Sequence, residues 1–318
     1  MKILFCGTPA FAVPTLRRLH REGFSVTAVV TQPDRPKGRG LTPAASPVKQ
    51  AALALGLRIE QPEKLRGEAG RALLTKYQPE AVVIVGYGQL IPADLLDPEA
   101  SGPRHGWINL HASLLPKYRG AAPVQWALMR GESITGVTTM RIDAGLDTGP
   151  ILLQAEEAIR EDDAAPALAA RLAERGAPLM VETLRGLAGG SLVPRTQDYS
   201  QASKAPLLKK EDGRIDWSLP AREIYNRIRG LAPWPGAFTT LREKNLHLWW
   251  AKPVEPPAGA VQAFAPGTLL VEKHALLVAC GSGSWLRLEE VQPADRKRQR
   301  AADFVNGLHI QTGERLTS

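Results

Sequence analysis

Short, continuous apolar runs alternate with segments of helical spacing over the first third of the chain. The runs at residues 2–7, 25–31 and 81–86 read as strands buried on both faces. Between the first two runs, a turn at 7–9 leads into a stretch whose apolar positions follow a helical period. This order predicts right-handed strand–helix–strand units, and therefore an α/β fold with an open, mostly parallel, Rossmann-like sheet.

The pattern changes in the second half of the chain. Residues 164–189 are rich in Ala and Leu at helical spacing, with Pro178 as a candidate break. From residue 208 onward, short strand-like runs separated by turn signals predict a smaller all-β barrel. These runs lie at residues 246–251, 267–271, 275–280 and 285–291. We therefore expect a first domain over 1–189, a polar linker rich in Gly, Ser and Pro over 190–207, and a second domain over 208–318.

Motifs and composition argue against several classes of function. The turn at 7–9 has neither a GxGxxG fingerprint nor a P-loop lysine, so no dinucleotide or triphosphate site is predicted. Cys6 and Cys280 lie far apart, and the six histidines form no ligand-like cluster, so we expect no metal and no disulfide framework. No signal peptide and no apolar run long enough for a bilayer is seen, which predicts a cytoplasmic protein away from membranes.

Candidate chemistry appears at residues 107–120, WINLHASLLPKYRG. Asn109 and His111 are two positions apart on an apolar strand, so their side chains point to the same face. An amide donor beside an imidazole suits acyl transfer, because one group holds a developing oxyanion and the other manages a proton. The structural alternative is a strand end at which Asn and His begin a turn. His105 is a rival base, which we interpret as a surface loop residue.

A second candidate follows at residues 135–152, where a β-branched run gives way to a turn-rich loop. Asp147 in this loop could orient and charge-stabilise the imidazole, as the carboxylate of a triad does. Asp143 is its rival, and either aspartate could instead cap a turn. The sequence alone does not show that Asp147 and His111 meet.

Asn109, His111 and Asp147, with SLLPKYRG after the histidine and GLDTGPI around the aspartate, resemble the 10-formyltetrahydrofolate-dependent formyltransferases. Over the whole chain, the resemblance is to the branch that acts on methionyl-tRNA. It implies transfer of a formyl group from 10-formyltetrahydrofolate to the amine of methionine on initiator tRNA, with these three residues as catalytic. It also implies a folate site made by the turn Ser113, Leu114, Leu115, Pro116 and by Gln89, Leu90 and Ile91 after the third strand.

A long loop at residues 32–49 carries the basic residues Arg35, Lys37 and Arg39 among prolines and glycines. Such a loop could be a solvent-exposed, flexible connection, or it could place positive charge against nucleic-acid phosphates. The net charge of +8 permits a polyanionic partner without establishing one. By resemblance, this loop contacts the tRNA acceptor arm with Arg39 foremost, and an oligonucleotide-binding-type barrel assists through residues such as Lys209 and Arg298.

Other functions share part of this pattern. A formyltransferase for a small amine, such as glycinamide ribonucleotide or an amino sugar nucleotide, would keep the three catalytic residues and lack the basic loop. A nonenzymatic RNA-binding protein would show no folate-dependent turnover, and hydrolysis of the donor to formate would replace the amine with water. We expect initiator methionyl-tRNA and the folate as partners of a monomer.

Overall fold

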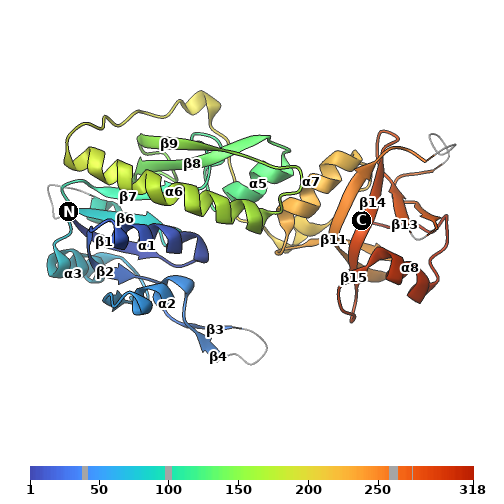
Figure 1. Ribbon diagram of the computed structural model, residues 1–318, viewed down its shortest axis with the longest axis horizontal. Helices are drawn as coiled ribbons and strands as arrows, with labels where there is room; N and C mark the ends of the chain where they lie inside the picture. Colours follow the sequence, from blue (N-terminus) through green and yellow to red (C-terminus); the bar gives the residue numbers. More distant parts are fainter. Residues whose placement is uncertain (38–41, 97–101, 258–263, 274) are drawn as a thin grey trace. The chain divides into compact units, whose positions relative to one another are not determined.

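The computed structural model describes residues 1–37, 42–96, 102–257, 264–273 and 275–318. The chain folds into two compact units (Figure 1). The first unit comprises Met1–Pro123, Ile134–Ala158 and Ala169–Ala205, and the second comprises Val124–Ser133, Ile159–Leu168 and Pro206–Ser318. The second unit therefore takes in two short segments from the amino-terminal part of the chain.

A seven-stranded sheet organises the first unit, with strand order β5-β2-β1-β6-β7-β8-β9. The five strands from β5 to β7 run parallel to their neighbours, and β8 and β9 are antiparallel. The strands are β1 (Lys2–Gly7), β2 (Ser25–Val30), β5 (Ile59–Glu60), β6 (Ala81–Val85), β7 (Trp107–His111), β8 (Ile134–Arg141) and β9 (Ile151–Ala158). This arrangement confirms the prediction of an open, mostly parallel sheet.

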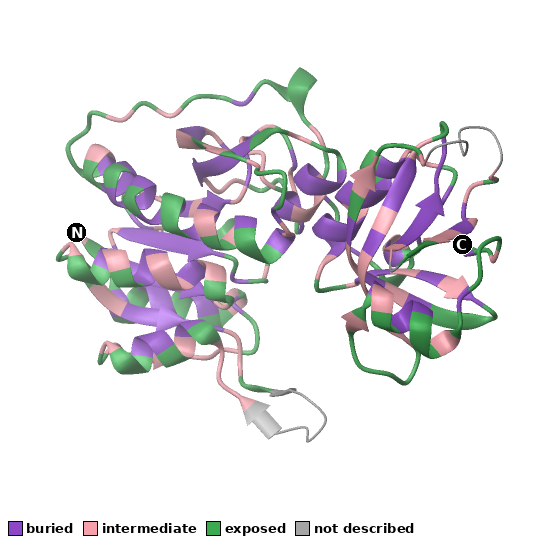
Figure 2. Ribbon diagram, turned by 45° about the vertical axis from the view of Figure 1, so that its right-hand side comes forward, coloured by how far each residue is buried: buried purple, intermediate pink, exposed green. Residues whose placement is uncertain are grey.

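Helices cover both faces of this sheet. On one face, Trp107 of β7 joins a buried cluster with Leu4, Ile84 and Tyr77, the last residue of helix α3. On the other face, Gly176 of helix α6 lies so close to Leu110 of β7 that a Cβ would stand 2.5 Å from a leucine methyl. Figure 2 shows the sheet as buried between helices whose outer surfaces are exposed. The helices of the first unit are α1 (Val13–Arg21), α2 (Pro47–Ala54), α3 (Gly67–Tyr77), α4 (Ala93–Leu96) and most of α6 (Ala165–Ala188), with a 3-10 turn at Ala10–Ala12. Helix α5 (Pro123–Met129) lies almost wholly in the second unit.

Helix α6 continues through Pro178, where the sequence indicated a break. Proline in a helix interior removes one backbone hydrogen bond and costs about 3 kcal/mol. The buried residues on either side, Ala177, Leu179, Met180 and Val181, hold this part of the helix in place through their packing. Tertiary packing therefore outweighs the local cost.

The second unit is built on an antiparallel sheet with order β10-β11-β14-β13-β12, and β15 also pairs with β14. Its strands are β10 (Ala237–Leu241), β11 (Lys244–Val254), β12 (Leu269–Glu272), β13 (Ala275–Ala279), β14 (Trp285–Pro293) and β15 (Gln299–Arg300). Helices α7 (Ala221–Leu231) and α8 (Ala301–Leu308) and a 3-10 turn at Lys210–Gly213 complete it. The prediction of a second all-β domain, made from short runs and turn signals, is confirmed.

The last residues of the chain connect the two edges of this antiparallel sheet. Thr317 exchanges two backbone hydrogen bonds of 2.9 Å with Thr240 of β10. Two residues earlier, Arg315 forms a bridge with Thr268, next to β12. Since edge strands otherwise expose unpaired backbone groups, these bridges satisfy part of both edges.

Two smaller features complete the description. A short hairpin, β3 (Arg35–Lys37) with β4 (Thr42–Ala44), rises from the first unit after β2. The carboxy-terminal part of the first unit contains a 3-10 turn at Tyr199–Gln201. Over the part of the chain that the structure describes, no helix is both long and apolar enough to cross a membrane.

Candidate active site

Strand β7 presents the predicted amide and imidazole where the parallel part of the sheet meets the antiparallel part. It pairs with β6 in parallel and with β8 in antiparallel register, with Asn109 opposite Ile84 and Met140. His111 is the last residue of the strand and lies opposite Thr138. Asn109 is half-buried and His111 is 6% exposed. The strand period thus places both polar side chains on one face, at the carboxyl edge where ligands bind in open α/β sheets.

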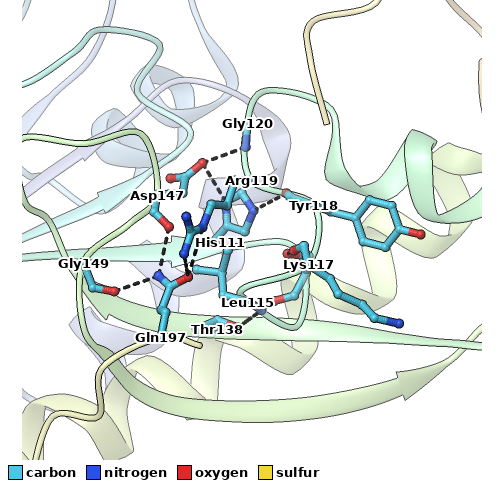
Figure 3. Close-up of polar contacts among 11 residues, drawn as sticks. His111, Leu115, Lys117, Tyr118, Arg119, Gly120, Thr138, Asp147, Gly149 and Gln197 are labelled. Atoms are coloured by element: carbon cyan, nitrogen blue, oxygen red, sulfur yellow. Dashed lines mark hydrogen bonds and ion pairs between the residues drawn. The ribbon is translucent and has the colours of Figure 1, made fainter. Parts of the chain in front are cut away.

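The ring of His111 lies between a carbonyl and a carboxylate (Figure 3). Its Nε2 is 2.9 Å from the backbone oxygen of Tyr118, and a carbonyl can only accept, so Nε2 carries a hydrogen. Its Nδ1 is 3.7 Å from Oδ2 of Asp147. In the protonated ring, both nitrogens would be donors, and the positive charge would stand beside the carboxylate. The structure therefore brings together the histidine and the aspartate that are 36 positions apart in the sequence.

Asp147 reaches this position from a tight loop between β8 and β9. Its backbone is left-handed, with φ of 52°. Its Oδ2 accepts a hydrogen bond of 2.8 Å from the backbone N–H of Gly120. Gly149 approaches the carbonyl of Arg141 so closely that a Cβ would stand 1.9 Å from it, which explains a glycine in this loop. The carboxylate is therefore fixed by loop geometry and by a backbone donor from a different segment.

The rival acid caps its own loop, and the rival base lies at the other end of β7 from His111. Oδ1 of Asp143 accepts hydrogen bonds from the backbone of Gly145 (3.1 Å) and the hydroxyl of Thr148 (2.6 Å), so Asp143 caps the loop. His105 lies just before β7, at the opposite end of that strand from His111. Burial, followed by the nearby Arg104 guanidinium, lowers the pKa of His105.

Several polar groups of the turn after β7 are hydrogen-bonded within the protein. The hydroxyl of Thr138 donates to the carbonyl of Ser113 (2.6 Å) and accepts from the N–H of Leu115 (3.1 Å). The side-chain hydroxyl of Ser113 donates to the carbonyl of Lys117 (2.6 Å), and Gln154 donates to the carbonyl of Leu115 (2.9 Å). Leu115 is buried, whereas Leu114 and Pro116 are half-buried. The turn is thus a rigid surface whose hydroxyl is already engaged.

The other residues predicted to bind folate lie along the loop that follows β6. The Gln89 amide holds the segment before α3, accepting from the N–H of Leu65 (2.7 Å) and donating to the carbonyl of Glu63 (3.0 Å). Leu90 is 83% exposed, and Ile91 packs against the buried cluster around Trp107. A cavity of 430 Å³ at this loop is lined by residues that include Gln32, Arg35, Lys64, Gln89 and Leu90.

The basic residues predicted to contact tRNA fall in different settings. Arg39 lies outside the described residues, and for Lys37 only the backbone, in β3, is described. Arg35 is exposed and lines the cavity at Gln89. Lys209 is exposed in the second unit, whereas Arg298 pairs with Glu290 and lies over the ring of Trp249, with its guanidinium carbon 4.9 Å from the ring centroid. Among the described residues, no His, Cys, Asp and Glu side chains form a group able to hold a metal.

Several supporting groups around His111 and Asp147 were absent from the sequence prediction. They are the backbone of Tyr118 and Gly120 and the side chains of Arg119 and Gln197, shown in Figure 3. The two backbone groups carry no sequence signal of their own. Gln197 lies in the segment that composition alone predicts to be a linker.

Substituting alanine for Gly120 is expected to displace the backbone donor of Asp147. Gly120 has φ of 126°, and a Cβ would stand 2.5 Å from the carbonyl oxygen of Ala205. We expect kcat to fall about 10- to 100-fold, because small misplacements of catalytic groups have effects of this size. The free energy of unfolding should fall by about 1–3 kcal/mol. Steady-state kinetics and thermal melting measure the two quantities.

Gly190→Ala is the matched control for this substitution. Gly190 also has positive φ, at 68°, but a Cβ there meets nothing within 4 Å. It should add a side chain at positive φ without a clash, while leaving kcat near that of the unmodified protein. Equal losses of kcat in both variants would show that the contact between Gly120 and Asp147 is unimportant.

Comparison with known proteins places this site in a family. The chain matches the Formyl transferase family over residues 1–184 and the Formyl transferase, C-terminal domain family over residues 207–309. It is 56% identical to a methionyl-tRNA formyltransferase of Solibacter usitatus, over 99% of this chain and 98% of the relative. It is 51% identical to a methionyl-tRNA formyltransferase of Koribacter versatilis, over 99% and 98% of the two chains.

Solved structures share the fold at lower identity. A sugar 3N-formyl transferase, WlaRD, solved in the presence of dTDP and 5-N-formyl-THF, superimposes with a TM-score of 0.67 at 17% identity, covering 93% of this chain and 99% of that one. A methionyl-tRNA formyltransferase from Clostridium thermocellum gives a TM-score of 0.54 at 18% identity, covering 79% and 93%. At these identities the likeness shows the fold alone.

Proposed function

The chain belongs to the formyl transferase family, and we propose that it transfers the formyl group of 10-formyltetrahydrofolate to the amino group of methionine on initiator methionyl-tRNA. Its activity is that of a methionyl-tRNA formyltransferase, the name carried by relatives that are 51% and 56% identical over nearly the whole chain. One observation supports the assignment of the site above all. Asp147 lies 3.7 Å from Nδ1 of His111, and His111 is on the face of β7 that also bears Asn109.

In the proposed reaction, the methionine amine attacks the formyl carbon, a C–N bond forms, and the bond between the formyl carbon and N10 of the folate breaks. The donor supplies the activated formyl group. Asn109 and the protonated His111 stabilise the oxyanion of the tetrahedral intermediate. Nε2 of His111 already donates to Tyr118, whereas Nδ1 lies 3.7 Å from Asp147, too far for a hydrogen bond, so Nδ1 is the donor left for this oxyanion. Asp147 stabilises the charge on the ring and, through a water, receives the proton that the amine loses. This proton then passes to N10 as the bond between the formyl carbon and N10 breaks, which restores the carboxylate.

A formyl-folate is the donor used across this family, and a folate derivative accompanies the sugar formyl transferase with the same fold. We propose that the turn from Ser113 to Pro116 and the loop carrying Gln89, Leu90 and Ile91 bind it. Because the hydroxyl of Ser113 and the amide of Gln89 are engaged within the protein, their contribution would be to shape the site. The backbone and apolar atoms of both loops are then the groups that would contact the pterin.

For the tRNA, we propose contacts from Arg35, Lys37 and Arg39 in the first unit and from Lys209 and Arg298 in the second. Positive side chains of this kind bind phosphates without reading the sequence, so they supply affinity. The pairing of Arg298 with Glu290 offsets part of its charge, which makes Lys209 the stronger candidate of the two in the second unit. We further propose that the protein acts as a monomer in the cytoplasm. We also propose a first domain at 1–189 and a second domain at 208–318, joined by a linker at 190–207.

Formyl transfer from 10-formyltetrahydrofolate to methionyl initiator tRNA, with methionyl elongator tRNA as the paired substrate, tests this proposal. We expect formylmethionyl product with the initiator and at least about tenfold lower kcat/KM with the elongator, because a difference of about 1.4 kcal/mol in binding already gives tenfold. Separation of the esterified amino acid after the reaction measures the product.

The alternatives give different products in the same assay. Formylation of a small amine, such as glycinamide ribonucleotide or an amino sugar nucleotide, without formylation of either tRNA would replace the proposed acceptor. Formate released from the donor in the absence of any amine would indicate hydrolysis. Binding of tRNA with no folate-dependent turnover would indicate an RNA-binding protein without this activity.

A further inference from the structure

The segment from Arg195 to Ala205 lies along the active site, although its composition is that of a flexible connection. Arg195 exchanges two backbone hydrogen bonds of 2.8 Å with Ile151, the first residue of β9. Further along, the N–H of Ala205 donates to the carbonyl of Arg119 (2.7 Å), and the N–H of Arg119 donates to the carbonyl of Ser203 (2.8 Å). The segment therefore joins the Asp147 loop side of the sheet to the loop that follows His111.

Gln197 lies at the centre of this segment and is 3% exposed. Its amide nitrogen donates to the carbonyls of Asp147 (2.9 Å) and Gly149 (2.7 Å). Its amide oxygen accepts from Nε (3.1 Å) and Nη2 (2.7 Å) of Arg119. Figure 3 shows the side chain between the Asp147 loop and Arg119. A buried amide with all of these bonds made fixes the groups that it joins, since breaking one leaves a buried polar atom unpaired.

The position of Gln197 matters because it acts on a loop whose backbone at Asp147 needs support from its surroundings. Asp147 adopts a left-handed backbone, a conformation that costs energy for any residue other than glycine. Such a conformation persists only where surrounding groups determine it. The carbonyl that Gln197 holds belongs to Asp147 itself, so the contact acts directly on the residue that carries the carboxylate.

The same segment also holds the other partner of His111. The hydroxyl of Ser203 accepts from the N–H of Tyr118 (2.9 Å), and the carbonyl of Tyr118 accepts from Nε2 of His111. Residues 197 and 203 therefore hold the two sides of the imidazole, one through Asp147 and one through Tyr118. Within the described residues, the polar partners of the ring are Tyr118 and Asp147, so residues 197 and 203 act on it indirectly.

We propose that Gln197 is a positioning residue for the reaction, which sets the Asp147 carboxylate against Nδ1 of His111. The expected effect of Gln197 on kcat rests on the proposed function, because the reaction measured is formyl transfer. The hydrogen bonds to Asp147 and Gly149 are the ones that matter for turnover, and the contact with Arg119 secures the amide in the orientation that makes them.

Two substitutions separate these contacts, with a third as control. Gln197→Met removes all four hydrogen bonds at similar length, and Gln197→Glu keeps an acceptor for Arg119 but places oxygen against the two carbonyls. We expect each to lower kcat about 10- to 100-fold with KM for tRNA and for the folate within about twofold. Gln201→Met, in the same segment but exposed, with its side-chain amide bonded to Asp198, should leave kcat unchanged.

Coupling with the catalytic aspartate distinguishes positioning from a general structural effect. If Gln197 acts through Asp147, adding Gln197→Met to Asp147→Asn should lower kcat by much less than the product of the two single effects. A folded Gln197→Met protein with the original kcat, or a double variant whose losses multiply in full, would overturn the proposal. If Gln197→Met does not fold, the same comparison is made with Gln197→Glu.

A measurement independent of turnover keeps this inference separate from the proposed function. Amide hydrogen exchange of residues 143–149 should be faster in Gln197→Met than in the unmodified protein, and unchanged in Gln201→Met. Absence of formyl transfer by the unmodified protein would reject the proposed function, while exchange in the loop would still report on the positioning. Unchanged exchange in a folded Gln197→Met protein would reject the positioning.

Discussion

Replacing Asp147 by asparagine is expected to lower kcat for formyl transfer by about 100- to 10,000-fold, the range associated with loss of acid–base assistance. The substitution keeps the shape of the side chain, and the asparagine oxygen can still accept from the N–H of Gly120. It removes the negative charge that stands 3.7 Å from Nδ1 of His111. The protonated ring then loses its counter-charge at the moment when the oxyanion needs a cationic donor, and the amine loses the acceptor for its proton.

The matched control is Asp143→Asn in the same loop. Asp143 caps the loop through Gly145 and Thr148, away from the imidazole, so its variant should lose far less kcat. Single-turnover formylation at saturating tRNA measures the chemical step, and filter binding measures the tRNA affinity, which we expect to stay nearly constant. A folded Asp147→Asn protein with kcat within about threefold of the original would contradict the assigned chemistry, because the whole expected effect is about 3–5 kcal/mol.

Asn109→Ala is expected to lower kcat by about 100- to 1,000-fold, as removal of one oxyanion donor does in other acyl-transfer enzymes. Asn109 is half-buried on the same face of β7 as His111, and its side-chain amide makes no hydrogen bond within the part of the chain that the structure describes. Its donor is therefore available to a ligand. Since the truncation removes few atoms from a half-buried position, stability should change little.

Asn245→Ala provides the control for Asn109→Ala, because Asn245 is also on a strand but exposed in the second unit. It should leave both kcat and tRNA affinity unchanged. For Asn109→Ala we expect kcat and kcat/KM to fall by the same factor, with KM unchanged for each substrate. This result would show that Asn109 acts in the transition state. Retained activity in a folded Asn109→Ala protein would remove Asn109 from the mechanism.

The position of the site follows from the order of strands. β7 is the last parallel strand, and its neighbour β8 runs in the opposite direction. The carboxyl end of β7 is next to the middle of β8, where Thr138 orders the turn after His111. From β8 the chain continues into the loop that carries Asp147. Because β8 ends beside the amino end of β7, where the N–H of Ile142 donates to the carbonyl of Trp107, this loop must turn back along β7 to bring Asp147 to the imidazole.

Much of the fold was determined by local sequence. Continuous apolar runs such as 81–86 predict buried parallel strands because helices cover both of their faces, and β6 at Ala81–Val85 fits this prediction. The period of two along β7 placed Asn109 and His111 on one face without any tertiary information. Short runs with turn signals likewise predicted the second all-β unit. Strand alternation and turn residues determine the backbone conformation of only a few neighbouring positions, so the sequence alone reveals them.

Tertiary structure alone decided how the site is held. The contacts of Asp147 with Gly120 and with Gln197 span 27 and 50 positions in the sequence. Two of the supporting groups, the N–H of Gly120 and the carbonyl of Tyr118, are backbone groups, which the residue type does not reveal. Composition placed Gln197 in a linker because polar segments rich in Gly, Ser and Pro have no apolar face to bury. Its order comes instead from hydrogen bonds to a distant loop, and such bonds form only where the fold brings buried donors and acceptors together.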